Sequence, residues 1–197
     1  MYNCCRLFRS TMENKYFVLV YHVNTQENIA KVVDSYKNGS GELYTSVEDG
    51  YWAGNGMYFW DNEGNANYWK KIRHNNYILM ANLKIEENCI LDLTDKDVLD
   101  ELDQLWPSVA KKFHIDVDSP PGRKINTICK YLKKIKVVKI NGYYPNMHEN
   151  RIIFKGKKNR KGKPHLTIKS KIIYCVKSAD RLENVRQLVR EEKKWTR

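Results

Sequence analysis

Runs of apolar and β-branched residues, separated by polar turns, predict a chain that alternates short strands with amphipathic helices. The predicted strands are residues 15–22, 57–60, 77–84, 89–93, 151–154 and 171–176. Each run is four to eight residues long, which is the length of a strand rather than of a buried helix.

Apolar residues spaced three and four positions apart predict three helices in the first half of the chain. One helix should follow an N-cap at Thr25 and pack through residues from Ile29 to Tyr36. A second should cover Asn62–His74, with Ala66, Trp69 and Ile72 inward. A third should follow an N-cap at Thr94 and end at Pro107, because proline disrupts a helix interior.

Two further helices are predicted in the second half of the chain. One should follow the turn at Ser119–Gly122 and pack through apolar residues from Ile125 to Ile135. The last should follow an N-cap at Ser178 and bury Leu182, Val185 and Leu188. Helices mixed with, and then packed on, mostly antiparallel strands indicate an α+β fold.

The composition adds the class of protein to this outline. The 197 residues, 42% of them hydrophobic, suit a single domain, 1–197, with a core of its own. We expect residues 1–14 to be flexible. No run of about 18 apolar residues occurs, so we expect no membrane partner and a cytoplasmic protein. The five cysteines form no CxxC pair and lie at no ligand spacing from histidines, so we expect no metal.

The charge is divided unevenly along the chain. Residues 121–197 carry 23 basic and 5 acidic side chains, a net charge of +18. Residues 1–120 carry 12 basic and 18 acidic side chains, a net charge of −6. A basic half of this size favours a polyanionic partner, and nucleic acid is the most common one.

The residues with the most specific pattern lie in and after the first two predicted strands. The first strand ends in Tyr21-His22, followed by Val23 and Asn24, and Tyr58 comes 36 residues after His22 in the segment GNGMYFW. Ten residues after Tyr58 comes Tyr68, in the context Ala-Asn-Tyr. The pattern is therefore a histidine, followed by two closely spaced glycines and then by two tyrosines.

This pattern resembles the ADP-ribosyltransferase superfamily, in its branch with a His-Tyr-Glu triad, on the side of diphtheria toxin and poly-ADP-ribose polymerase. The resemblance covers residues 15–93 well, and the GMYFWD segment is also similar to small bacterial domains of that fold. It implies a split β-sandwich with peripheral helices and an enzyme that transfers ADP-ribose from NAD. Several small bacterial members are toxins or phage-defence effectors, so an antitoxin protein is an implied partner.

The resemblance implies a role for each of these residues. Tyr58 and Tyr68 would enclose the flat, cationic nicotinamide ring by stacking and cation–π attraction. His22 would hydrogen-bond the adenosine ribose, and Val23 and Asn24 would continue the same wall. Val23 stands where the family usually has glycine. Gly56 would let the backbone approach the ligand without a Cβ.

The third member of the triad has two alternative positions. A carboxylate beside the ribose would stabilise the oxocarbenium-like sugar that forms when nicotinamide leaves. Glu149 opens the predicted strand at 151–154 and lies 91 residues after Tyr58, a spacing that suits the family. In the competing alignment the equivalent strand is 171–176, which has no acidic residue.

The acceptor is predicted from the basic half of the chain. The nucleic-acid-binding loop predicted at 155–163 contains six cationic side chains, those of Lys155, Lys157, Lys158, Arg160, Lys161 and Lys163. Tyr143 and Tyr144 could stack on a base. RNA or single-stranded DNA is favoured over duplex DNA, because chemistry on a base requires that base to be exposed.

Three alternatives remain open. The acceptor could be a protein side chain, or the chain could be an inactive RNA-binding module of the same fold. A third alternative is an RNA 2′-phosphotransferase, which relies on several arginines around a phosphate. Residues 1–120 contain only Arg6, Arg9 and Arg73, which argues against that activity.

Overall fold

The computed structural model describes residues 14–47, 52–73, 77–144 and 169–189. Within these ranges the strands are β1 (Lys15–Asn24), β2 (Met57–Trp60), β3 (Tyr77–Glu86), β4 (Ile90–Asp92), β5 (Val137–Tyr143), β6 (Ser170–Val176) and β7 (Leu182–Gln187). The α-helices are α1 (Gln26–Lys37), α2 (Glu63–Arg73), α3 (Lys96–Phe113) and α4 (Pro121–Tyr131), and η1 (Glu87–Cys89) and η2 (Ala179–Arg181) are single 3-10 turns. None of the helices in these ranges is long and apolar enough to cross a membrane.

The strands of the described ranges form one seven-stranded sheet in the order β4-β5-β6-β2-β1-β3-β7. β4 and β5 run parallel, and every other pair of neighbours in this sheet is antiparallel. Four α-helices accompany the sheet within the same ranges. The predicted α+β class and the mostly antiparallel pairing are therefore confirmed.

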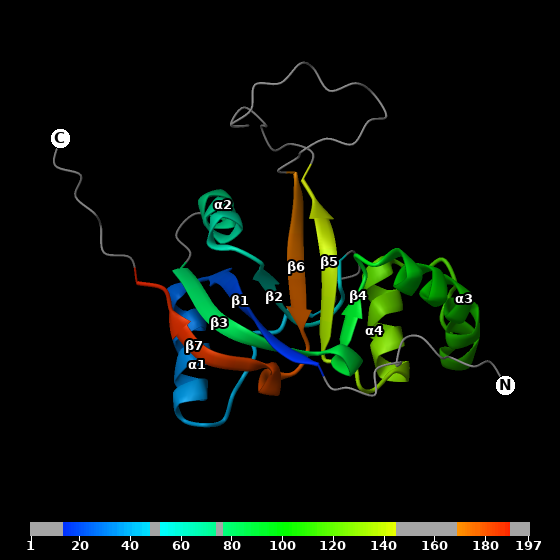
Figure 1. Cartoon of the computed structure of the whole chain (residues 1–197), viewed down its shortest axis with the longest axis horizontal. Coiled ribbons are helices and arrows are strands. Elements are labelled where there is room, and N and C mark those ends of the chain that lie inside the picture. The colour runs from blue at the N-terminus through cyan, green and yellow to red at the C-terminus, as the bar shows by residue number, and fades with distance from the viewer. Residues whose placement is uncertain (1–13, 48–51, 74–76, 145–168, 190–197) are drawn as a thin grey trace, which may run out of the picture.

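The sheet is weakly joined at its centre. β1 pairs with β3 along its whole length, from Lys15↔Glu86 to Asn24↔Tyr77, whereas β1 and β2 share the single register pair Tyr21↔Trp60. We call this junction the β1–β2 seam. In Figure 1, β5 and β6 stand upright on one side of it, and β1, β3 and β7 cross beneath them on the other. The two parts of the sheet therefore diverge from the seam.

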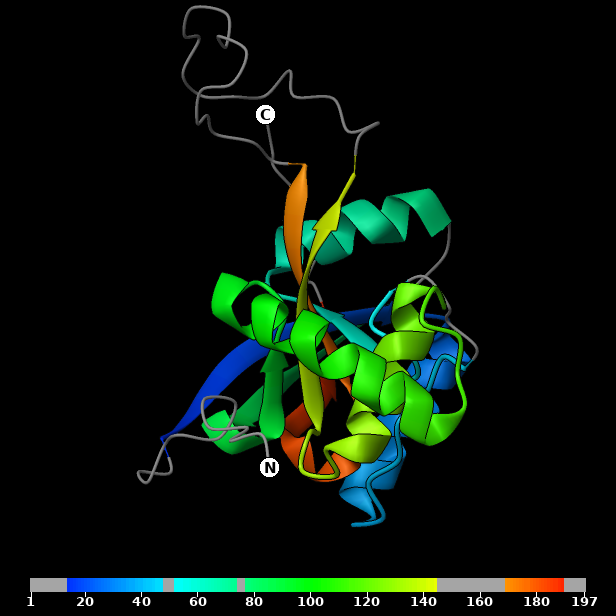
Figure 2. The same cartoon turned by 90° about the vertical axis from the view of Figure 1, so that its right-hand side faces the viewer.

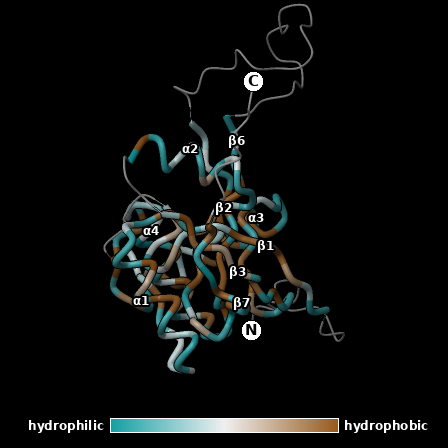
Figure 3. Tube along the Cα trace, turned by 90° about the vertical axis from the view of Figure 1, so that its left-hand side faces the viewer, coloured by the Kyte–Doolittle hydropathy of each residue, from teal (hydrophilic) through white to brown (hydrophobic). Residues whose placement is uncertain are grey.

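Three groups of buried side chains hold these layers together. The largest lies between the two parts of the sheet and α1, and includes Val20, Phe59 and Leu83. A second packs α3 and α4 on β4, β5 and β6, and Figure 2 shows both helices on that side. A third places α2 over β1, β2 and β3 through Ala66 and Trp60. Figure 3 shows hydrophobic residues concentrated around the strands in the middle of the molecule.

The prediction of a last helix after Ser178 is wrong. The chain makes the 3-10 turn η2 and then forms β7, which pairs with the free edge of β3. Asn184 adopts a positive φ of 53°, and the register slips between Met80 and Asn82. This irregularity places Leu182 and Val185, three residues apart, on the same core. The helix-like spacing of these two apolar residues is thus accommodated by a bulged strand.

Three other expectations also need correction. α3 continues through Pro107 to Phe113, because Val109 and Ala110 beyond the proline are buried and offset the lost hydrogen bond. The N-cap of α3 is Asp95 and not Thr94, whose hydroxyl donates to Asp92. Strand β5 was not predicted, although its Val137 and Val138 are fully buried.

Several predicted features lie outside the described residues. They are the strand 151–154, the segment 1–13 of the expected flexible N-terminus, and the basic loop 155–163.

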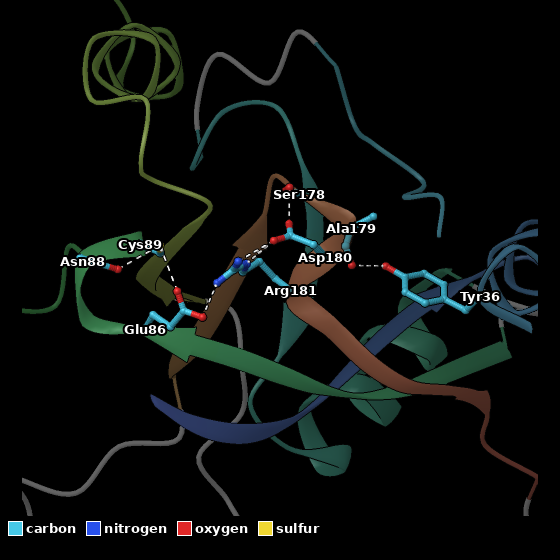
Figure 4. A network of polar contacts seen from close by, with 8 residues as sticks. All are labelled: Tyr36, Glu86, Asn88, Cys89, Ser178, Ala179, Asp180 and Arg181. Atoms are coloured by element: carbon cyan, nitrogen blue, oxygen red, sulfur yellow. Dashed lines mark hydrogen bonds and ion pairs between the residues drawn. The ribbon is translucent and has the colours of Figure 1, made fainter. Parts of the chain in front are cut away.

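A network of polar contacts around Arg181 joins three elements at the far end of the sheet (Figure 4). Its guanidinium lies 3.1 Å from Glu86 Oε1 at the end of β3 and 2.5 Å from Asp180 Oδ2. The Arg181 side chain is 11% exposed, and the hydrogen bond from its guanidinium lowers the pKa of Asp180 to about 2. The Tyr36 hydroxyl of α1 donates to the Ala179 carbonyl at 2.7 Å. The network thus ties η2 to β3 and α1.

Replacing Arg181 should test how much this network stabilises the fold. Arg181→Gln should lower the free energy of unfolding by about 2 kcal/mol, because Glu86 and Asp180 lose a shared cation. Urea denaturation followed by circular dichroism measures the change. Lys31→Gln, which removes an exposed ion pair with Glu27 on α1, is the control and should change stability far less. Equal losses in both variants would contradict a structural role for the network.

Candidate functional site

A cavity of about 480 Å³ opens at the β1–β2 seam. β1 contributes His22, Val23 and Asn24 to its wall, and β2 contributes Tyr58, Phe59 and Trp60. The remaining lining residues come from loops and from other elements, and are Tyr44, Ser46, Trp52, Trp69, Arg73, Tyr144 and Ile173. Two strands that share one register pair leave room between their side chains, so the seam itself creates the cavity.

His22 bridges the seam. Its Nδ1 atom lies 2.7 Å from the Tyr58 carbonyl oxygen, and its Nε2 atom lies 3.2 Å from Asn24 Nδ2. A carbonyl oxygen only accepts, so Nδ1 carries the proton and Nε2 accepts from the amide. Burial lowers the pKa of His22 to about 4, and the imidazole is therefore neutral near pH 7. A neutral ring held at both nitrogens has one fixed orientation.

Tyr58 is held at both ends. Its carbonyl accepts from His22, and its hydroxyl donates to the Gly54 carbonyl at 2.5 Å. The ring lies on the opposite face of β2 from Met57 and Phe59, which fill the central core. Phe59 also packs against the His22 ring, with centroids 5.5 Å apart. The structure therefore brings the first two predicted site residues into one wall of the cavity.

Tyr68 lies beside the cavity. Its ring meets the edge of Tyr144 at a centroid distance of 6.3 Å, and Lys171 Nζ stands 5.4 Å from its centroid. Among the described residues, Tyr144 and not Tyr68 forms that part of the wall. Lys171 is buried, donates to Asn65 at 2.6 Å, and has a pKa lowered by burial. A cation therefore faces Tyr68 where the prediction had a nicotinamide ring.

The two glycines before Tyr58 are explained by packing within the protein. A Cβ on Gly56, whose φ is +157°, would lie 2.4 Å from Cys175 Sγ and 2.8 Å from the Val176 carbonyl oxygen. A Cβ on Gly54, with φ +74°, would lie 2.2 Å from Asn126 Oδ1. Glycine is thus needed for contact with β6 and α4, and Gly56 does not line the cavity at the seam.

The predictions missed most of the aromatic wall. Trp60 packs against Trp69 at 5.8 Å and against Tyr144 at 5.9 Å, and Trp52 lies 6.0 Å from Tyr144. Arg73, at the end of α2, holds its guanidinium 5.0 Å from the Trp69 ring centroid. The clustering of tryptophan near Tyr58 in the sequence was the available signal. No local pattern, however, brings Tyr144 to Trp60.

No acidic side chain lines the cavity among the described residues. Glu149, the predicted carboxylate, lies outside the described ranges. β6, the strand that pairs with β2 at Tyr58↔Cys175, has the sequence SKIIYCV and contains no acid. The described residues also contain no group of three His, Cys, Asp or Glu that could hold a metal ion.

No family model, curated protein or solved structure matches this chain. Its function is therefore inferred from the side chains that surround the cavity.

The neutral His22 predicts a specific dependence of stability on pH. The unfolded chain takes up a proton near pH 6.5 and the folded chain only near pH 4, so stability is lost as the pH falls through this window. The free energy of unfolding should fall by about 3 kcal/mol between about pH 7 and about pH 4 from this group. Urea denaturation at a series of pH values measures the loss.

His22→Asn keeps a donor near the Nδ1 position but does not titrate, so this part of the pH dependence should disappear. His114→Asn is the matched control, because His114 is an exposed left-handed residue that ends α3. In His114→Asn the free energy of unfolding should fall with decreasing pH as steeply as in the unmodified protein. An unchanged slope in His22→Asn would contradict a buried neutral imidazole.

The packing of Gly56 is tested by a pair of alanine substitutions. Gly39→Ala places a methyl group where no atom lies within 4 Å, so only the backbone strain of its φ of +78° remains, about 1 kcal/mol. Gly56→Ala should cost about 2 kcal/mol more, because the methyl group meets β6. Thermal and urea unfolding measure both changes. Equal losses would show that Gly56 is not required by packing.

Proposed function

We propose that this protein is an NAD-dependent ADP-ribosyltransferase that modifies a nucleic acid, with single-stranded RNA or DNA as the favoured acceptor. The observation that carries the proposal is the meeting of His22 and Tyr58 in one wall of an aromatic cavity. These residues are 36 positions apart in the sequence and belong to the motif that resembles this superfamily. A sheet that divides at a central seam agrees with the split β-sandwich of the proposed family.

The cavity suits a dinucleotide with a cationic ring. Its volume of about 480 Å³ is within the range of small-molecule sites. Nicotinamide in NAD is flat and positively charged, and the rings of Tyr58, Trp60 and Tyr144 offer stacking faces and cation–π attraction. Arg73 supplies a guanidinium at the rim for the diphosphate. Tyr144 or a tryptophan would take the second stacking position that the motif assigned to Tyr68.

The proposed reaction breaks the bond between the nicotinamide nitrogen and C1′ of the ribose. Nicotinamide leaves with the electron pair of that bond, and positive charge develops on the ribose as an oxocarbenium-like species. A nucleophilic atom of the acceptor then bonds to C1′ and loses its proton. His22 is neutral and oriented, and in the proposed complex its Nε2 atom accepts from a ribose hydroxyl in place of the Asn24 amide, which is a binding role rather than proton transfer. Glu149 is the proposed carboxylate that stabilises the sugar cation and accepts the proton.

A second candidate function is a binding module of the same fold that does not split NAD. It is favoured by one observation, the lack of an acidic side chain among the described residues of the cavity wall. Such a module would bind NAD or a nucleotide and leave it intact. Measuring binding and cleavage of NAD separately distinguishes the two functions.

The acceptor is identified by incubation with NAD labelled in its adenylate part. Labelled NAD and the protein are incubated together in four separate reactions, which contain RNA, single-stranded DNA, duplex DNA or a cell lysate. We expect label on single-stranded nucleic acid, together with release of nicotinamide measured by chromatography. Label found only on proteins of the lysate would contradict a nucleic-acid acceptor and show that the acceptor is a protein. Binding of NAD without release of nicotinamide would select the second candidate.

Two variants test the assigned roles. Arg73→Gln should raise the KM for NAD about tenfold with little change in kcat, because it removes a contact to the diphosphate. Lys71→Gln on the same helix is the control, since it has the same change of charge and does not line the cavity. Glu149→Gln should lower kcat about 100-fold or more. Normal turnover in Glu149→Gln would move the catalytic carboxylate to another residue.

A further inference from the structure

A second cavity, of about 460 Å³, lies beside the first and is lined by lysines. Lys130 and Lys133 come from α4 and the turn after it, Lys136 precedes β5, and Lys177 follows β6. Asn55 and Asn126 form part of its wall and hydrogen-bond each other. We call this space the lysine cavity. All four lysines belong to the basic half 121–197, and the predicted nucleic-acid-binding loop at 155–163 contains none of them.

Among the described residues, the only acid with a charge interaction to the lysine cavity is Asp180, which lies outside its lining and acts on Lys136. No aspartate or glutamate lines it, and no described acid forms an ion pair with Lys130, Lys133 or Lys177. Lys177 Nζ donates to the Ala53 and Asn55 carbonyls at 3.0 and 2.6 Å, which fixes its position without changing its charge. An ammonium group has a third donor, so Lys177 can still bind an anion.

The lysine cavity and the cavity at the seam share a wall. Thr45 and Asn55 face the lysine cavity, whereas Ser46 and Tyr58 face the other. Between them, Ser46 and Gly56 exchange two backbone hydrogen bonds of 3.0 and 3.1 Å. The wall is therefore the short β-bridge between Ser46 and Gly56. A polymer bound in the lysine cavity would end or turn beside the aromatic rings of the other cavity.

We propose that the lysine cavity binds the phosphodiester backbone of a single-stranded nucleic acid and places the next nucleotide at the mouth of the aromatic cavity. Lysine ammonium groups are point charges that hold phosphates regardless of sequence. A base of the same strand can then stack on the aromatic wall. An acidic peptide would use the lysines but not the aromatic rings, so a polynucleotide fits both cavities. The role in acceptor binding rests on the proposed function, whereas the binding itself does not.

Fluorescence anisotropy with labelled single-stranded RNA and single-stranded DNA oligonucleotides, without NAD, tests the proposal. Lys130→Gln/Lys133→Gln should weaken binding about tenfold at about 100 mM salt. The slope of the logarithm of the association constant against the logarithm of the salt concentration should become shallower by about 1.4. This is about 0.7 for each lost phosphate contact. Lys130→Arg/Lys133→Arg keeps both charges and should bind like the unmodified protein. The RNA and DNA arms show which of the two strands binds more tightly.

Lys31→Gln/Lys37→Gln is the matched control. It removes the same charge from α1, where neither lysine lines the lysine cavity or the cavity at the seam, so affinity and slope should both be retained. Equal weakening in this control would indicate an effect of total charge and would overturn the site. Unchanged binding in Lys130→Gln/Lys133→Gln would also overturn it. Tighter binding of poly-glutamate than of either oligonucleotide, lost in the same variant, would replace the nucleic acid with an acidic protein.

This experiment is independent of NAD cleavage. Release of nicotinamide from NAD is measured separately, without nucleic acid. Lysine-dependent binding of a strand without NAD cleavage would leave the lysine cavity in place and reject the proposed enzyme. Cleavage of NAD without lysine-dependent binding would reject the lysine cavity and leave the enzyme in place.

Discussion

The hydrogen bond from His22 to the Tyr58 carbonyl holds the sheet together where its own ladder nearly ends. β1 and β2 share one register pair, so the side chain of His22 supplies a link that backbone groups would supply in a regular sheet. Burial keeps the imidazole neutral, and a neutral ring donates at Nδ1 while accepting at Nε2 from Asn24. The junction of the two parts of the sheet and the wall of the cavity therefore depend on the same contact.

The geometry of both cavities follows from that seam. β1 and β2 diverge, and the partly packed side chains of Tyr58 and Trp60 line the cavity that opens at the seam. The segment before β2 is pressed against β6 and α4, where Gly54 and Gly56 leave no room for a Cβ. The same segment separates the aromatic cavity from the lysine cavity. Tight packing on one side of this segment thus defines two adjacent sites with different chemistry.

Much of the fold could be predicted from the sequence, because apolar periodicity reports local burial. It identified β1, β2, β3, β4 and β6, the helices α1 and α2, and the beginning of α4. It failed where a distant contact decides the local structure. Leu182 and Val185 have a spacing typical of a helix, yet the free edge of β3 and the bulge at Asn184 make that segment a strand. Pro107 should end a helix, yet burial of Val109 and Ala110 continues it.

The sequence by itself determined the residue types of the candidate site: a histidine at a strand end, a tyrosine 36 positions later, and a basic second half. These are properties of single positions and of their spacing along the chain. Only the tertiary structure decided that Tyr144 joins Trp52 and Trp60, that Lys171 faces Tyr68, and that the glycines serve packing. Each of these contacts joins residues from different elements, and strand order and register, which no local pattern contains, bring them together.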